Sequence, residues 1–201
     1  MSDLESPDAM PRLIAFLSLL LQKVAESNDP GRRIHPPQRI SVFHGLTRPA
    51  ISIQSYLERI FKYANCSPSC FVVAYVYLER FAQQQPALPI NSLNVHRLLI
   101  TSVMVAAKFL DDIYYNNAYY AKVGGISTVE MNFLEVDFLF GLGFNLNVTP
   151  TAFHTYCSYL QREMLQQSPL AAMEDDGRPQ KLRLICFNED EASHQKQELA
   201  V

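Results

Sequence analysis

Apolar side chains recur along this chain with the period of a helix rather than that of a strand. In one stretch, five of them follow spacings of i, i+4, i+7, i+8 and i+11: Ile53, Leu57, Ile60, Phe61 and Ala64. This spacing aligns them on one face of an amphipathic helix. Similar patterns predict an N-terminal helix and five core helices, over about 9–26, 49–64, 68–85, 93–110, 127–141 and 149–164. Because we find no strand-like alternation of useful length, the sequence predicts an all-α protein.

The predicted helices begin at residues that favour a helix start. Three of them have a Ser or Thr followed within two residues by proline: Thr47 and Pro49, Ser67 and Pro68, and Thr149 and Pro150. A hydroxyl at the cap and proline in the first turn suit the unpaired N–H groups there. Ser127 and Glu130 have the spacing of a capping box, and Gly141 and Gly143 end that helix.

The helix predicted over 93–110 is apolar on most of its sides. One face carries Val95, Leu98, Leu99, Ser102, Val103 and Ala106, and much of the remaining surface is Ile100, Met104 and Ala107. A helix that is apolar on most sides is surrounded by other helices. We therefore expect this one at the centre of the domain.

Charge is balanced over most of the chain. Residues 1–172 carry 13 basic and 13 acidic side chains, so the net charge of −3 comes from the residues that follow. A neutral body offers no basic surface to a phosphate backbone, which argues against nucleic-acid binding. The segments "EDDGRPQ" and "NEDEASHQKQE" predict a flexible, disordered acidic tail over 166–201.

The most apolar run, "LIAFLSLLL" at 13–21, is only nine residues long. This is too short to span a bilayer, and the acidic residues before it are unlike a secretory signal. We expect no membrane association and a location in the nucleus, the cytoplasm or both. In such a reducing compartment the four cysteines are expected to be free thiols.

Two motifs raise the possibility of metal chemistry. Asp111 and Asp112 in "FLDDIYYNN" are similar to the Asp-rich motif with which all-α terpenoid synthases bind magnesium and a diphosphate, but Tyr115 stands where a third aspartate is usual. Two carboxylates supply few of the ligands a hard cation needs. Cys66 and Cys70 would be half of a zinc site without a second pair. The sequence therefore predicts no enzyme, no catalytic residue, no metal site and no cofactor.

Three separated segments resemble a single cyclin box: "VVAYVYLERF", "VMVAAKFLDDIYYNNAYYAKVGGIS" and "MNFLEVDFLFGLGFNL". The closest likeness is to the P-type (also called U-type) cyclins of plants, relatives of the yeast phosphate-signalling cyclin. The resemblance implies an N-terminal helix and linker over 1–44, a cyclin box over 45–165 and the tail over 166–201. It also implies a regulatory subunit that binds a cyclin-dependent kinase 1:1, the A-type kinase in plants, and activates it in cell division or nutrient-linked phosphorylation.

The same resemblance implies a kinase-binding site. Cyclins share a lysine and a glutamate that anchor the kinase segment leading into its C-helix, and Lys108 in "AAKFLDD" and Glu135 in "FLEVDF" match those positions. Phe109, Leu139 and Phe144 match the apolar residues that receive the kinase helix. Without the resemblance, Lys108 would be read as an ordinary cation at a helix C-terminus, and Glu135 as a residue of a solvated face.

The first core helix departs from the pattern of animal cell-cycle cyclins. It reads "RPAISIQSYLERI" and lacks the Met-Arg-Ala-Ile-Leu motif; Tyr56 stands where the following tryptophan would be, and the chain has no tryptophan. The resemblance therefore does not extend to their substrate-docking patch. The segment "REML" (162–165) fits the R-x-x-L degradation pattern, which is common by chance. A single-box adaptor in a transcription or signalling complex, without kinase activation, is the alternative function.

Overall fold

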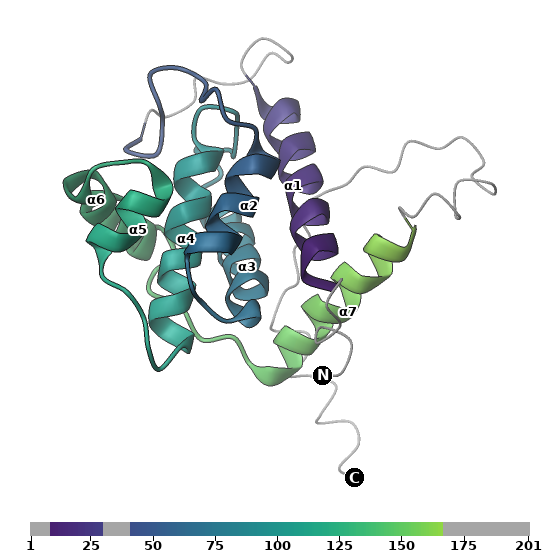
Figure 1. Ribbon diagram of the computed structural model, residues 1–201. Helices are drawn as coiled ribbons and strands as arrows, with labels where there is room; N and C mark the ends of the chain where they lie inside the picture. The colour runs from purple at the N-terminus through teal and green to yellow at the C-terminus, as the bar shows by residue number, and fades with distance from the viewer. Residues whose placement is uncertain (1–8, 30–40, 167–201) are drawn as a thin grey trace.

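The computed structural model of the chain describes residues 9–29 and 41–166. Within these residues it contains helices and no strand, so the predicted all-α class is confirmed. The helices are α1 (Ala9–Asn28), α2 (Ile53–Tyr63), α3 (Pro68–Gln84), α4 (Val95–Leu110), α5 (Asn117–Gly124), α6 (Thr128–Gly141) and α7 (Pro150–Gln166) (Figure 1). Of the tail predicted over 166–201, only Gln166 is described, as the last residue of α7; of the region predicted over 1–44, residues 1–8 and 30–40 lie outside the described residues.

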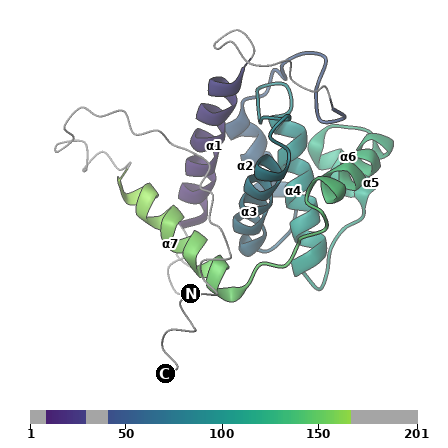
Figure 2. The same cartoon turned by 180° about the vertical axis from the view of Figure 1, so that it is seen from behind.

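Helix α4 is the central helix, as its sequence predicts. It lies between α2 and α3 on one side and α5 and α6 on the other, and it contacts all four (Figures 1 and 2). Every residue from 98 to 107 is buried, whereas the next three, at the C-terminal end of the helix, are accessible to solvent. The polar and aromatic residues that follow the buried run therefore emerge at the surface of the domain.

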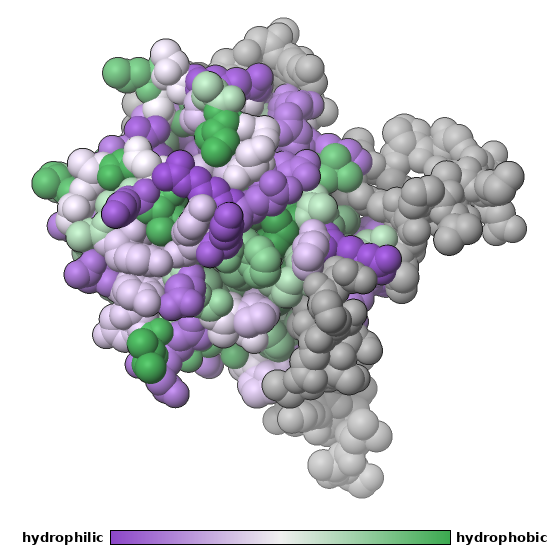
Figure 3. Space-filling model, viewed as in Figure 1, coloured by the Kyte–Doolittle hydropathy of each residue, from purple (hydrophilic) through white to green (hydrophobic). Residues whose placement is uncertain are grey.

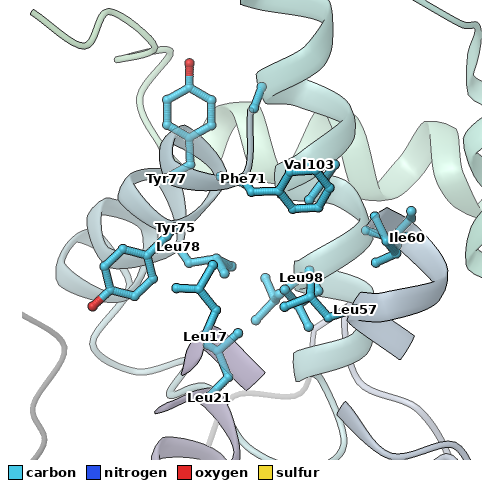
Figure 4. Packing of buried hydrophobic residues seen from close by; sticks show 14 of the residues in the cluster. Leu17, Leu21, Leu57, Ile60, Phe71, Tyr75, Tyr77, Leu78, Leu98 and Val103 are labelled. Carbon is cyan, nitrogen blue, oxygen red and sulfur yellow. The ribbon is translucent and has the colours of Figure 1, made fainter. Parts of the chain in front are cut away.

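Side chains of every helix from α1 to α7 contribute to the core, and those of α1 to α4 meet in one part of it. Figure 4 shows them meeting: Leu17 and Leu21 from α1, Leu57 and Ile60 from α2, Phe71, Tyr75 and Leu78 from α3, and Leu98 and Val103 from α4. Each fully buried Leu, Ile, Val or Phe contributes about 1.5–3 kcal/mol relative to an exposed one. Helix α1 thus buries its apolar side in the domain, packed on α2 and α7, rather than presenting it to a partner.

Helix α2 begins at Ile53, four residues later than the predicted start near Pro49. The cap is Ser52, whose side chain accepts a hydrogen bond from the backbone N–H of Ser55 at 3.0 Å, and Thr47 does not serve as the cap. The predicted apolar face is buried except for Phe61, which is 39% exposed and packs edge-on against Phe71. Tyr56 is 4% exposed and joins that face instead.

Helix α5 was not predicted. It is short, with Asn116 as its cap, accepting from the N–H of Tyr119 at 3.0 Å, and it ends at Gly125, whose φ of 72° is left-handed. Its eight residues include only three buried ones: Tyr120, Ala121 and Val123. A stretch of this length is too short to display a helical period. The only sequence signals for α5 are the residues at its two ends, Asn116 and Gly125.

Buried polar groups of α3 tie the C-terminal part of the domain to the core. The hydroxyls of Tyr75 and Tyr156 donate to the two carboxylate oxygens of Glu79 at 2.5 and 2.7 Å, joining α3 to α7. Arg80 donates to the carbonyls of Asn145 and Asn147 at 2.8 and 2.9 Å. These contacts hold the connection between α6 and α7 along α3.

Candidate functional site

The structure brings Lys108 and Glu135 together. Lys108 is in the last turn of α4, Glu135 is in the middle of α6, and these helices pack against each other. The Lys108 Nζ donates to Glu135 Oε1 at 2.7 Å. About a quarter of the Lys108 side chain and a fifth of the Glu135 side chain remain exposed, at 26% and 19%. The pair is therefore preformed, and both charged groups remain within reach of another molecule.

A third residue, Asn117, completes this polar cluster. Its Oδ1 accepts from Lys108 Nζ at 2.5 Å, and its Nδ2 donates to Glu135 Oε2 at 2.6 Å and to Asn132 Oδ1 at 2.8 Å. Asn117 is the first residue of α5, the helix that was not predicted. The polar cluster of Lys108, Glu135, Asn117 and Asn132 thus joins α4, α5 and α6. Asn117 lies in the segment "YYNNAYY", where no helix was predicted, and Asn132 lies on α6; neither was predicted as part of a site, because an isolated amide carries no local signal of one.

The three apolar residues of the predicted site differ in exposure. Phe109 directly follows Lys108 and is 48% exposed, and Phe144 is 56% exposed, whereas Leu139 is partly buried against the core. Leu139 is four residues beyond Glu135 on α6, so the two side chains share a face of that helix. Two exposed rings and an aliphatic side chain thus accompany the charged pair on α4, α6 and the residues that follow α6.

Phe144 has an unusual backbone. Its φ is 57°, a left-handed conformation that bulky residues adopt rarely. Its N–H donates to the carbonyl of Leu139 at 2.9 Å, which closes the C-terminus of α6 after Gly143, itself at a φ of 55°. The ring of Phe144 packs edge-on against Phe140, with centroids 5.2 Å apart. The end of α6 therefore holds a large ring at the surface at some cost in backbone energy.

Additional exposed hydrophobic residues, not included in the prediction, lie on α6 and in the connection between α4 and α5, the elements that flank or carry the polar cluster. On α6 they are Val129, Phe133, Val136 and Phe140, and in the connection between α4 and α5 they are Ile113, Tyr114 and Tyr115. Figure 3 shows hydrophobic residues at the surface over these parts of the fold, separated by polar ones. The exposed apolar residues of α6 recur with a helical spacing. They were not predicted as surface residues, because from the sequence alone apolar positions were expected in the core.

Asp111 has a structural role that argues against the metal alternative. Its Oδ2 accepts from the backbone N–H of Ser67 at 2.9 Å and from the thiol of Cys70 at 3.4 Å. One carboxylate therefore joins the end of α4 to the start of α3. Cys66 donates a hydrogen bond to the Cys70 sulfur, which raises the pKa of the Cys66 thiol and lowers the pKa of Cys70. In the described ranges, no group of three or more His, Cys, Asp or Glu side chains is placed to hold a metal ion.

None of the helices at 9–29 and 41–166 is both long enough and apolar enough to cross a bilayer. Cys66, Cys70 and Cys157 are free thiols, and Cys186 lies outside the described residues.

The conspicuous feature of the described surface is the polar cluster with its exposed rings. Such a mixture of charged anchors and aromatic side chains is typical of a protein–protein interface.

A helical domain with charged anchors and exposed rings has the surface features of a protein-binding module. Comparison with known families identifies its kind. The model of the cyclin family matches residues 11–146, and the chain belongs to that family. The match starts within α1 and ends before α7. The division into 1–44, 45–165 and 166–201 stays a prediction.

The most informative relatives are plant cyclins of the U and P types, which confirms the resemblance drawn from the three segments. Cyclin-U4-1 of Arabidopsis thaliana is 72% identical over 199 residues, covering 98% of this chain and 97% of the relative. Cyclin-P4-1 of Oryza sativa subsp. japonica is 61% identical over 171 residues, covering 82% and 81%. Cyclin-U4-3 of Arabidopsis thaliana is 52% identical, covering 98% and 94%. Cyclins are non-catalytic regulatory proteins and generally partner cyclin-dependent kinases.

Proposed function

We propose that this cyclin binds a cyclin-dependent kinase 1:1, with Lys108 and Glu135 as polar anchors, and that it activates the kinase. The observation that supports this best is the preformed pair itself, 2.7 Å apart and partly exposed at the junction of α4 and α6. Lys108 uses two of its three ammonium donors within the domain, so one remains for a backbone carbonyl of the kinase. The carboxylate of Glu135 has lone pairs left to accept a backbone N–H.

The apolar part of the contact is assigned to Phe109, Leu139 and Phe144. Exposed rings give buried area when a helix packs on them, and desolvation of the centre strengthens the charged hydrogen bonds beside them. The kinase C-helix is the proposed occupant. Activation then requires only that the cyclin binds the active kinase conformation more tightly than the inactive one. In that conformation the C-helix glutamate pairs with the ATP-positioning lysine.

The experiment is co-expression with a plant A-type cyclin-dependent kinase, followed by size-exclusion chromatography and a phosphate-transfer assay on a generic substrate. We expect a 1:1 complex with activity above that of the kinase alone. A folded, helical protein that neither binds nor activates the kinase would contradict the proposal and favour the adaptor function. Consistent with a kinase-regulating role, we place the protein in the nucleus, the cytoplasm or both, which a fluorescent fusion would test.

A further inference from the structure

We propose that Asn117 is a positioning residue of the kinase-binding site, which holds Lys108 and Glu135 in the geometry that the kinase recognises; this inference rests on the proposed function. Asn117 is the residue of the polar cluster that contacts both charged groups. It accepts from Lys108 at 2.5 Å and donates to Glu135 at 2.6 Å. As the first residue of α5, it brings a third helix to a pair formed by α4 and α6. In Figure 1, α5 lies beside α6.

The amide of Asn117 has one favourable orientation. Both hydrogens of its Nδ2 are used, one by Glu135 and one by Asn132. Turning the amide over would place its NH2 group against the Lys108 ammonium and its oxygen against the Glu135 carboxylate. Both contacts would then be repulsive, so the side chain is fixed by its own hydrogen bonds.

Fixing Asn117 restricts the two side chains that it contacts. Lysine and glutamate are long and lose much rotamer freedom when a partner orders them. Here Lys108 has two acceptors, on different helices, and each oxygen of Glu135 has a donor from the domain. Ordering that is completed before binding does not oppose binding, and preorganisation of this kind increases affinity. The Lys108 ammonium is also held within reach of the kinase rather than extended into water.

The test measures the Kd for a purified plant A-type cyclin-dependent kinase with four forms of the cyclin. They are the wild type, Asn117→Ala, Asn132→Ala and Gln54→Ala, the last being a control that removes an exposed amide of α2 bonded only to Glu58 of the same helix. We expect the Kd of Asn117→Ala to be about tenfold higher than that of the wild type. For Asn132→Ala we expect the increase in log Kd to be about half as large. Gln54→Ala should bind like the wild type.

A pH series on Asn117→Asp separates positioning from a merely structural role. The new carboxylate would meet Glu135 where the amide donated, and two carboxylates at hydrogen-bond distance share a proton rather than both ionise. The charged groups bonded to this position are Lys108 from α4 and Glu135 from α6. We expect Asn117→Asp to bind about 30-fold more weakly than the wild type at pH 8 but within about threefold at pH 5.5. The ratio for Asn117→Ala should not change with pH.

The outcomes are distinct. If the wild type binds and Asn117→Ala binds equally well, the inference is wrong while the proposed function stands. If the wild type does not bind the kinase, the proposed function fails first. If Asn117→Ala does not fold, Asn117→Asp decides: recovery of affinity at pH 5.5 supports positioning, and affinity that is independent of pH overturns it.

Discussion

At the scale of single residues, Lys108 serves both the fold and the surface. Its ammonium lies near the carbonyl end of α4 and bonds Glu135 and Asn117, yet 26% of the side chain is exposed. Partly exposed ion pairs contribute about 1 kcal/mol or less to stability. A desolvated charge contact with a partner is worth more, since truncating such pairs costs about 2–5 kcal/mol of binding. Affinity should therefore respond to changes at Lys108 far more than stability does.

We expect Lys108→Glu to abolish kinase binding and to lower the melting temperature by no more than about 4 °C, because about 1 kcal/mol shifts a domain of this size by 2–4 °C. The replacement places a carboxylate beside Glu135 and removes the donor offered to the kinase. Size-exclusion chromatography with the kinase and thermal unfolding measure the two effects. Lys23→Glu, at an exposed position of α1, is the matched charge reversal and should change neither. Loss of fold together with binding would make Lys108 structural.

Phe144 is a second residue at which stability and kinase affinity should respond differently, here with stability unchanged or increased and affinity reduced. Asparagine tolerates the left-handed region better than a bulky side chain does, so Phe144→Asn should relieve backbone strain of about 1 kcal/mol. Little burial is lost, because Phe144 is 56% exposed. We expect a melting temperature equal to or above that of the wild type, with kinase affinity reduced about tenfold or more, as for an aromatic anchor. A lower melting temperature with unchanged affinity would show that the ring serves the fold alone.

At the scale of helices, packing overrides local preference at the end of α6. Gly141 is the last residue of that helix, where alanine is favoured by up to about 1 kcal/mol on propensity. A Cβ atom at this position would overlap the ring of Phe81, which is buried and stacked on Phe138 at 5.1 Å. The absence of a side chain at Gly141 lets α3 and α6 approach each other.

Gly141→Ala should therefore destabilise the fold by about 1–3 kcal/mol, the usual cost of overpacking, although propensity alone predicts the reverse. Chemical denaturation compares it with Gly143→Ala, where the added atom has more space and the left-handed φ of 55° causes the strain. A free energy of unfolding that is unchanged or increased in Gly141→Ala would mean that Phe81 can move aside.

The starts of α3 and α6 are features of the fold that the sequence predicts well. Pro68 at the start of α3 and Ser127 before α6 mark real helix starts, because proline and a capping hydroxyl act locally. Of the predicted capping box, one hydrogen bond is present, from the Glu130 N–H to the Ser127 hydroxyl. The Glu130 carboxylate instead accepts from Arg97 of α4 at 2.6 Å. The Lys108–Glu135 pair came from resemblance. The role of Asn117 in the polar cluster could not be predicted, because it depends on α4, α5 and α6 packing together, and no local sequence pattern encodes that packing.

At the scale of the whole molecule, stability is linked to pH through a half-buried histidine. His96 lies on α4, contacts the carbonyl of Ile51 through Nε2 at 3.0 Å and packs edge-on against Tyr56. Its Nδ1 is buried without a hydrogen-bond partner, so a proton there would find no acceptor. Burial lowers the pKa of His96 below its ordinary value of 6.5. Burial also lowers the pKa of His44, beside Ser41.

A lowered pKa means that the unfolded chain binds more protons than the folded one once the pH falls below about 6.5. The contribution of His96 to stability is therefore complete above pH 6.5 and is lost as the pH falls towards its folded-state pKa. We expect the free energy of unfolding, from urea titrations at pH 7.5, 6.5 and 5.5, to decrease by at most about 1.4 kcal/mol per pH unit for each such histidine. His96→Gln keeps a donor for Ile51 but does not titrate, so its decrease should be smaller than that of the wild type. An equal decrease in both proteins would assign the pH dependence to other groups.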